Sequence, residues 1–258
     1  MPATSPGVSA EPSLTLDPIT IAVFALAVAL LGLSKGGLAG LGMMALPMML
    51  LVMPPATAAG LMLPILITQD SLTVYIYWGK WDVWNLKVLL PGAMLGIAVG
   101  FLSFAVMPER VLLFVLGVIT LTFAVRGLLA RAAPAKVPHP AMGVFLGGVS
   151  GFTSTILHQG GPPFQIYMLP QKLPRDVFIS TTVVFFAVLN LVKLPGFIAL
   201  GQLTAPNLTI ALAAAPWALF MTWVGSKLVR RIAVERFYVI IHWLLALVGA
   251  KLLGDALL

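Results

Sequence analysis

The sequence HQGGPP at residues 158–163 interrupts an apolar run that begins at Val144. It places a titratable ring, an amide, two glycines and two prolines where a membrane helix would otherwise continue. Lipid cannot satisfy free backbone N–H and C=O groups, so a broken helix is stable only against protein or a water-filled cavity. A second break, SKGG at residues 34–37, follows an apolar run that begins at Ile19. Two breaks in corresponding places of two halves indicate the binding site of a transporter.

The composition is that of an integral membrane protein. Of the 258 residues, 60% are hydrophobic and only 9% are charged, and the mean hydropathy is +1.05. A soluble domain is about a quarter charged. The net charge of +7 comes from basic residues in short loops between apolar segments, where they set membrane orientation. We therefore expect the lipid bilayer, and no nucleic acid, as the partner. The absence of cysteine excludes disulfides, thiolate catalysis and iron–sulfur ligation.

The apolar segments divide the chain into two similar halves. They cover residues 19–34, 38–53, 56–78, 84–106 and 109–130, then 140–157, 161–171, 174–200, 206–228 and 233–256. A membrane span needs about 20 apolar residues, and the second segment of each half is short. Each half therefore predicts a helix, a break, a half-helix that dips into the membrane, and three longer helices. The prediction is an all-α membrane protein of two five-element repeats whose half-helices meet near the midplane.

The two halves also match residue by residue. Gly36-Gly37 corresponds to Gly160-Gly161, Pro47 to Pro170, the turn at 78–81 to that at 200–203, and residues 108–111 to 234–237. The offset between these matches stays between 122 (201 − 79) and 126 (234 − 108). A steady offset favours a duplicated unit over chance similarity between leucine-rich segments. We expect a mobile tail at 1–18, a first repeat at 19–131, a linker at 132–139 and a second repeat at 140–258.

Loop charges predict how the two repeats lie in the membrane. Basic residues mark four loops. Lys80 and Lys87 lie at the loop between the third and fourth segments, and Arg126, Arg131 and Lys136 lie at the linker between the halves. In the second half, Lys172 and Arg175 lie just before the segment at 174–200, and Lys227, Arg230, Arg231 and Arg236 lie between the last two helices. These loops are expected in the cytoplasm. The N-terminal tail and residues 201–207 have no Lys or Arg. The repeats then enter the membrane from opposite sides, as an inverted pair, and both termini are extracytoplasmic.

Four ionisable residues lie far from the loops: Lys35, Asp70, His158 and Lys193. An ionisable residue within the membrane is costly and is by default a functional hypothesis. Lys193 shares one helix face with Thr182 and Asn190 by helical spacing. This face either lines a cavity or forms a hydrogen-bonded contact between helices. We favour the cavity, because a lysine costs more in such a contact than threonine or asparagine.

The glycine pairs predict an anion site. A helix that begins within the membrane presents unpaired N–H groups and the positive end of its dipole, and glycine lets a ligand approach them. Such a helix start binds anions. Basic side chains lie beside each pair. The expected substrate-binding residues are Lys35, Gly36, Gly37, His158, Gln159, Gly160, Gly161, Thr182, Asn190 and Lys193. The expected coupling or gating residues are Asp70 and His158.

Asp70 and Lys193 occupy nearly equivalent places in the two halves. An offset of 122 puts Asp70 opposite Val192, one residue from Lys193. One hypothesis is a buried ion pair that gates the anion, with protonation of Asp70 linking transport to pH. The alternative places the Asp70 carboxylate in water near the cytoplasmic surface, away from Lys193. A shift of one residue rotates a helical side chain by about 100°, so the sequence leaves both open.

Across residues 19–256 the sequence resembles the TauE/SafE family of sulfite and organosulfonate exporters. The residues that carry the resemblance are SKGG (34–37), Pro47, PGAMLG (91–96), GFTS (151–154), HQGGPP (158–163), TTVVFF (181–186) and NLVKLP (190–195). The resemblance implies a multi-pass carrier of the bacterial inner membrane that moves sulfur-containing anions. The family often has a longer glycine run at each break, whereas this chain has Lys35 and Gln159 before the glycine pair. The substrate can therefore differ within the family.

We expect a secondary transporter, an exporter of sulfite or a short organosulfonate that works by alternating access. An anion channel is the alternative, because channels also contain inverted repeats with half-helices. An intramembrane enzyme is less consistent with the chain, which has no H-E-x-x-H and no G-x-S-x-G motif. There is also no G-x-x-x-x-G-K-[ST] loop for ATP. We expect no catalytic residue, metal or cofactor, with a proton or sodium as the coupling ion.

Overall fold

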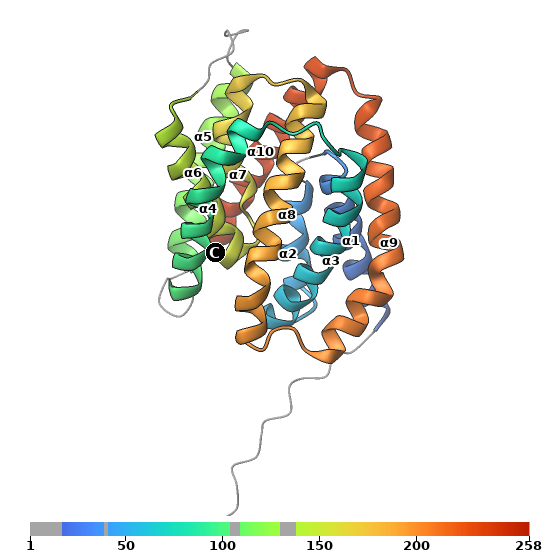
Figure 1. Cartoon of the computed structure of the whole chain (residues 1–258). Coiled ribbons are helices and arrows are strands. Elements are labelled where there is room, and N and C mark those ends of the chain that lie inside the picture. Colours follow the sequence, from blue (N-terminus) through green and yellow to red (C-terminus); the bar gives the residue numbers. More distant parts are fainter. Residues whose placement is uncertain (1–16, 39–40, 104–108, 130–137, 258) are drawn as a thin grey trace, which may run out of the picture.

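The computed structural model describes residues 17–38, 41–103, 109–129 and 138–257, and every regular element within them is a helix (Figure 1). In chain order these are α1 (Pro18–Lys35), the 3-10 helix η1 (Leu41–Met44), α2 (Ala45–Leu50), α3 (Pro55–Ile76), α4 (Val83–Ser103), α5 (Glu109–Leu129), α6 (Pro140–Leu157), α7 (Gly161–Met168), the 3-10 helix η2 (Leu169–Gln171), α8 (Arg175–Ala199), α9 (Ala205–Arg230) and α10 (Val234–Leu257). Residues 1–16 and 130–137 lie outside the described part of the chain. They include most of the expected tail (1–18) and of the expected linker (132–139), with Arg131 and Lys136.

The helices begin and end close to where the sequence predicts. Asp17 caps α1 by accepting hydrogen bonds from the backbone N–H groups of Ile19 and Thr20, as N-cap residues do. At the second break, Pro162 and Pro163 fall in the first turn of α7, where a missing N–H costs nothing. The expected half-helices are short, six residues for α2 and eight for α7.

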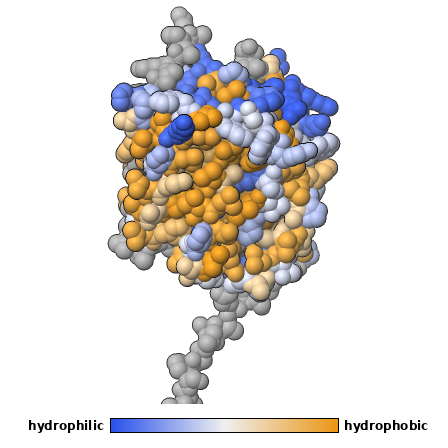
Figure 2. Space-filling model, in the orientation of Figure 1, coloured by the Kyte–Doolittle hydropathy of each residue, from blue (hydrophilic) through white to orange (hydrophobic). Residues whose placement is uncertain are grey.

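Apolar residues cover the middle of the molecule on the face seen in Figure 2. Among the described helices, five are long and apolar enough to cross a membrane: α1, α3 (from Thr57), α4, α8 and α9. Figure 2 shows hydrophobic residues over the middle of the visible face and hydrophilic residues gathered at one end. This distribution is typical of a protein whose middle faces lipid.

The hydrophilic end contains the loops that the charge pattern placed together. Lys80, after α3, donates to the Asp176 carboxylate at 3.0 Å. Arg175, at the start of α8, donates to the carbonyl oxygens of Val229 and Ile232 at the end of α9. We call this the basic end of the molecule. It fixes the directions of the helices, since α8 and α4 begin there and α9 ends there.

Glycines bring α4 and α6 into backbone contact. A Cβ added at Gly92 would collide with the Val144 carbonyl oxygen, and one at Gly96 would collide with the Gly148 carbonyl oxygen, one turn further along α6. Further along, Gly100 faces Thr155. Small residues allow this close approach, which is how helices associate in lipid. The contacts advance in the same direction on both helices, so α4 and α6 are parallel and both run away from the basic end.

Helices α1 and α9 are also parallel and in close contact. Gly32 packs against Met221 and Gly36 against Ser226, so both helices advance together. Because α9 ends at the basic end, α1 runs toward that end, whereas α6 runs away from it (Figure 1). The first helices of the two halves therefore have opposite directions.

Helices α3 and α8 occupy the centre of the molecule and pack against each other. Each contains an internal proline, Pro64 in α3 and Pro195 in α8. Helices α5 and α10 form a further packed pair. The two breaks, 36–38 and 158–160, both border α8, where Gly37 faces Ile179 and Gly160 faces Phe186, and this placement creates the candidate site.

Candidate functional site

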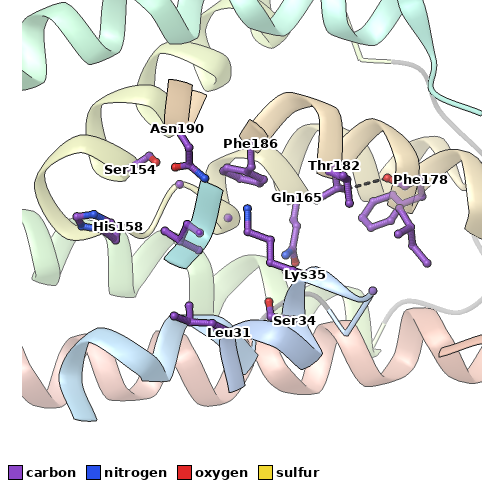
Figure 3. Close-up of a pocket in the computed structure, with 17 residues that line it drawn as sticks. Leu31, Ser34, Lys35, Ser154, His158, Gln165, Phe178, Thr182, Phe186 and Asn190 are labelled. Atoms are coloured by element: carbon purple, nitrogen blue, oxygen red, sulfur yellow. Dashed lines mark hydrogen bonds between the residues drawn. The ribbon is translucent and has the colours of Figure 1, made fainter. Parts of the chain in front are cut away.

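A cavity of about 110 Å³ lies between the two breaks (Figure 3). The first break contributes Lys35 and Gly37 to its lining, and the second contributes His158, Gly160 and Gly161. A single water needs about 10–15 Å³ of such space, so the cavity has room for several waters or one compact ligand. The structure thus brings the two predicted breaks to one place.

One face of α8 forms a wall of this cavity. Thr182, Phe186 and Asn190, spaced four residues apart, line it, and Phe178 extends the same face by one turn toward the basic end. The predicted polar face of this helix therefore borders a cavity. Lys193 continues the face beyond the cavity, where its side chain is completely buried.

Lys193 lies next to the cavity without lining it. Its Nζ donates to the carbonyl oxygen of Ser154 at 3.1 Å and to the Ser154 hydroxyl at 3.0 Å, and Ser154 does line the cavity. An ammonium group has three donors, and these two bonds use two of them. Lys193 makes no ion pair with any acidic residue in the described part of the chain.

Asp70 joins the two sides of the site. Its Oδ1 accepts from the Lys35 Nζ at 2.5 Å, and its Oδ2 accepts from the Asn190 side-chain amide at 2.7 Å. Only 4% of Asp70 is exposed. Lys35 and Asn190 line the cavity whereas Asp70 lies behind them. The Lys35 ammonium also lies 5.7 Å from the centre of the Phe186 ring.

Both hypotheses for Asp70 are therefore corrected. Asp70 does not pair with Lys193, because α8 presents Asn190, one turn earlier, to its carboxylate. The long Lys35 side chain reaches it from the end of α1 instead. Asp70 also does not reach water near the surface, since it is buried against these two donors.

The second break holds polar atoms without protein partners. His158 ends α6 in the left-handed conformation (φ 54°), and neither of its ring nitrogens has a hydrogen-bond partner in the described structure. The Gln159 side-chain oxygen is likewise unpartnered, but Gln159 faces a separate apolar cavity beside α10. Gly160 accepts from the Ser150 hydroxyl through its carbonyl oxygen at 2.6 Å. Unpartnered buried nitrogens beside a cavity indicate a place for water or a ligand.

Gly36 serves the fold and not the cavity. A Cβ at this position would lie 2.5 Å from the backbone nitrogen of Ser226 on α9, so Gly36 allows α1 and α9 to touch. Gly37, with a φ of 134°, lines the cavity. The helix after this break begins at Leu41, four residues further on, whereas α7 begins directly at Gly161. The two breaks are therefore similar in position but different in detail.

Among the polar residues that line the cavity, sequence reasoning did not place Gln165 and Ser154 at the site. Gln165 lies in the second turn of α7, is 2% exposed, and its side-chain oxygen has no partner among the described residues. Its side chain lines the cavity between the residues of α8 and those of α1 (Figure 3). An amide inside an apolar half-helix would have revealed Gln165 if uncharged polar residues had been weighed like the charged ones.

Three rings in contact lie on the side of the cavity away from the basic end, and His158 among them lines the cavity. The His158 ring meets Phe197 edge-on at 5.6 Å between centres, and Phe197 meets Phe101 at 5.9 Å. Phe197 lies seven residues beyond Asn190, which is about 10 Å along α8. The cavity therefore occupies the half of the bundle nearer the basic end, and we call these three rings the aromatic floor.

Two lysines and one aspartate lie at or directly behind the cavity. Lys35 and Asp70 neutralise each other, and Lys193 has only the neutral oxygens of Ser154. No group of three metal-binding side chains is found among the described residues. The arrangement suits a small anion, with amide donors from Asn190 and Gln165 nearby, whereas the Thr182 hydroxyl donates to the Phe178 carbonyl oxygen.

Comparison with known proteins identifies one family. The model of the family described as "Sulfite exporter TauE/SafE" matches residues 24–252. The match includes both breaks and every residue that lines the cavity. No curated protein and no solved structure matches the chain.

Proposed function

Because the chain belongs to the TauE/SafE sulfite exporter family, we propose that it is a secondary transporter that exports a small sulfur-containing anion. Sulfite or a short organosulfonate fits the proposal best. The family is one of membrane transporters for sulfur-containing anions, and the chain has no ATP-binding loop of the G-x-x-x-x-G-K-[ST] type. The energy would come from an ion gradient, with a proton or sodium as the coupling ion.

The observation that carries this proposal is the cavity between the two breaks. It combines a small volume with two basic side chains, Lys35 in its lining and Lys193 directly behind it on Ser154. A cation would be repelled there, and an apolar molecule would leave the polar groups of Gln165 and His158 without partners. A compact oxyanion can accept from several of these donors at once.

We further infer that the halves are inverted repeats related by a pseudo-two-fold axis in the membrane plane, the arrangement of many alternating-access carriers. The opposite directions of α1 and α6 support this. The contact pattern supports it too. In the two halves α4 corresponds to α9 and α1 corresponds to α6, and the pairs α4–α6 and α9–α1 are both closely packed. The corresponding turns both contain a glycine with positive φ, Gly79 and Gly201, and the corresponding helices both contain an internal proline, Pro91 and Pro216.

The basic end would face the cytoplasm of a bacterial cell and both termini would lie outside, by the bias of Lys and Arg toward the inside. The cavity would then be nearer the cytoplasm, and the aromatic floor would separate it from the outside. In this arrangement an exporter takes its anion from the cytoplasmic side before the floor opens.

Flux in liposomes tests the function. Purified protein should transport at least one of sulfite, sulfoacetate, taurine, thiosulfate and sulfate, with saturation and with counterflow, which a channel does not show. Gln165→Leu removes a cavity amide whose oxygen has no protein partner, so it should weaken anion affinity without unfolding the protein. Gln202→Leu is the matched control, because Gln202 has a similar unpartnered oxygen outside the cavity. Equal affinities in the two variants would contradict the assignment of the site.

A further inference from the structure

The two ends of the cavity differ in chemistry. Ser154, His158 and Asn190 line the end nearer the aromatic floor, whereas Phe178 and Thr182 line the end nearer the basic end of the molecule (Figure 3). Helix α8 sets this order, because it begins at the basic end and rises about 1.5 Å per residue. Asn190 therefore lies about 12 Å beyond Thr182 along the helix axis. A ligand in this cavity meets two different surroundings.

The end nearer the basic end of the molecule has an apolar lining. Phe178, Ile179 and Val183 border it from α8, and all three side chains are buried. Thr182 lies among them, but its hydroxyl already donates to the Phe178 carbonyl oxygen at 2.7 Å. A water molecule there would find few of the two to four polar partners that it needs. An apolar group therefore fills this end better than water does.

The other end supplies hydrogen-bond donors. The Lys35 side chain has three N–H donors when it is an ammonium group, and it uses one of them on Asp70. The Asn190 amide has two and also uses one on Asp70. The Ser154 hydroxyl accepts from Lys193, so its own hydrogen is available to a ligand. These groups suit the oxygens of an anionic head group.

We propose that the cavity binds short alkanesulfonates in one orientation, with the sulfonate group between Lys35 and Asn190 and an unsubstituted alkyl chain against Ile179 and Val183. The proposal rests on the proposed function, because it specifies the substrate class of the same cavity. Sulfite would occupy only the polar end. Taurine and isethionate would place an ammonium or a hydroxyl group at the apolar end.

Two names describe the parts of this site. The head subsite consists of Lys35, Ser154, His158, Gln165 and Asn190. The tail subsite consists of Gly37, Phe178, Ile179, Thr182 and Val183. Gly37 belongs to the tail subsite because a Cβ placed on it would lie 3.1 Å from the end of the Ile179 side chain.

Calorimetric titration of the purified full-length protein tests this with probes that share one head group. Methanesulfonate, ethanesulfonate and propanesulfonate are all monoanions and differ only in the length of the alkyl chain. Each added CH2 group should lower the Kd about fourfold as it enters the tail subsite. Isethionate has nearly the shape of propanesulfonate, with a hydroxyl in place of the terminal methyl group. It should bind about tenfold more weakly, because the hydroxyl loses its bonds to water in an apolar place.

Two neighbouring valines provide a matched pair of variants. Val183 lines the cavity, whereas Val184 packs against the hydrophobic core outside it. Val183→Ala should weaken propanesulfonate about fourfold more than methanesulfonate, and Val184→Ala should leave the ratio of the two affinities unchanged. Gln165→Leu, in the head subsite, should weaken both sulfonates alike. Ile179→Val is a milder change in the tail subsite and should shift the ratio in the same direction if Val183→Ala does not fold.

Three results would overturn the proposal while leaving the transport function intact. The first is equal affinity for methanesulfonate and propanesulfonate. The second is an isethionate affinity equal to or above that of propanesulfonate, which would mean that the tail subsite is polar. The third is an equal shift of the ratio in Val183→Ala and Val184→Ala, which would mean that the alkyl chain binds elsewhere. If the protein binds neither these sulfonates nor any of the sulfur anions used in the flux assay, the proposed function itself fails.

Discussion

The ion pair between Lys35 and Asp70 should contribute strongly to stability, and a double-mutant cycle can measure how strongly. Lys35→Met and Asp70→Asn each leave the other charge without its partner. Two unit charges about 4 Å apart attract by about 4 kcal/mol at an effective dielectric constant of 20. Removing one partner of a buried pair costs about 3–5 kcal/mol. The side chains are 13% and 5% exposed, so solvent reduces this cost only slightly and each single variant should lose about 3–4 kcal/mol.

The assay is equilibrium unfolding by sodium dodecyl sulfate in mixed micelles, followed by circular dichroism. The double variant removes both charges and keeps an amide that Asn190 can bond, so it should be more stable than either single variant. Asp255→Asn is the control, because its partner Lys251 and Asp255 itself are 37% and 38% exposed, and such surface pairs contribute about 0–1 kcal/mol. A loss below about 1 kcal/mol for Asp70→Asn would show that water reaches the pair and would refute the argument from burial.

The remaining predictions concern packing, orientation and a helix cap. Gly96→Ala should destabilise the protein because its Cβ would meet an α6 carbonyl oxygen, whereas Gly254→Ala, with open space around it, should gain about 0.5–1 kcal/mol of helix stability; the same unfolding assay compares them. In this chain without native cysteine, a cysteine at Arg231 should react from the cytoplasm and one at Ala205 from outside; labelling from a shared side would exclude the predicted orientation. Hydrogen bonds from Thr20 and Ile19 lower the pKa of Asp17, so its capping stability is present above the unfolded pKa and is lost as pH falls through the folded one. Hydrogen exchange in the first turn of α1 should therefore accelerate at acidic pH, and an unchanged rate would contradict the cap.

Most of the fold could be predicted because membrane segments have a strong and simple sequence signal. The long runs of apolar residues place α8 and α9 within a few residues of their observed bounds. Glycine and proline at 160–163 placed the second break and the start of α7 correctly. The loops with Lys80 and Arg175 were also expected on one side, and their hydrogen bonds join them at one end.

The pairing inside the site could not be read in the same way. A repeat offset gives the depth of a residue but not the rotation of its helix, and about 100° separates neighbouring positions. Asp70 therefore met Asn190 and not Lys193. The reach of Lys35 depends on its own flexible chain. Gly36 was expected at the site because glycine marks both a ligand approach and a helix contact, and only the position of α9 distinguishes the two.

The aromatic floor has a consequence for speed. Under the proposed alternating access, an anion would wait for Phe101, Phe197 and His158 to separate and would cross no faster than the packed helices that carry these rings rearrange. Collective motions of this kind take microseconds to milliseconds, so one molecule would pass on the order of a thousand to a million anions per second at most. An open pore has no such ceiling. Export capacity would then scale with the number of copies in the membrane, and sudden accumulation of the anion could be relieved only by making more protein.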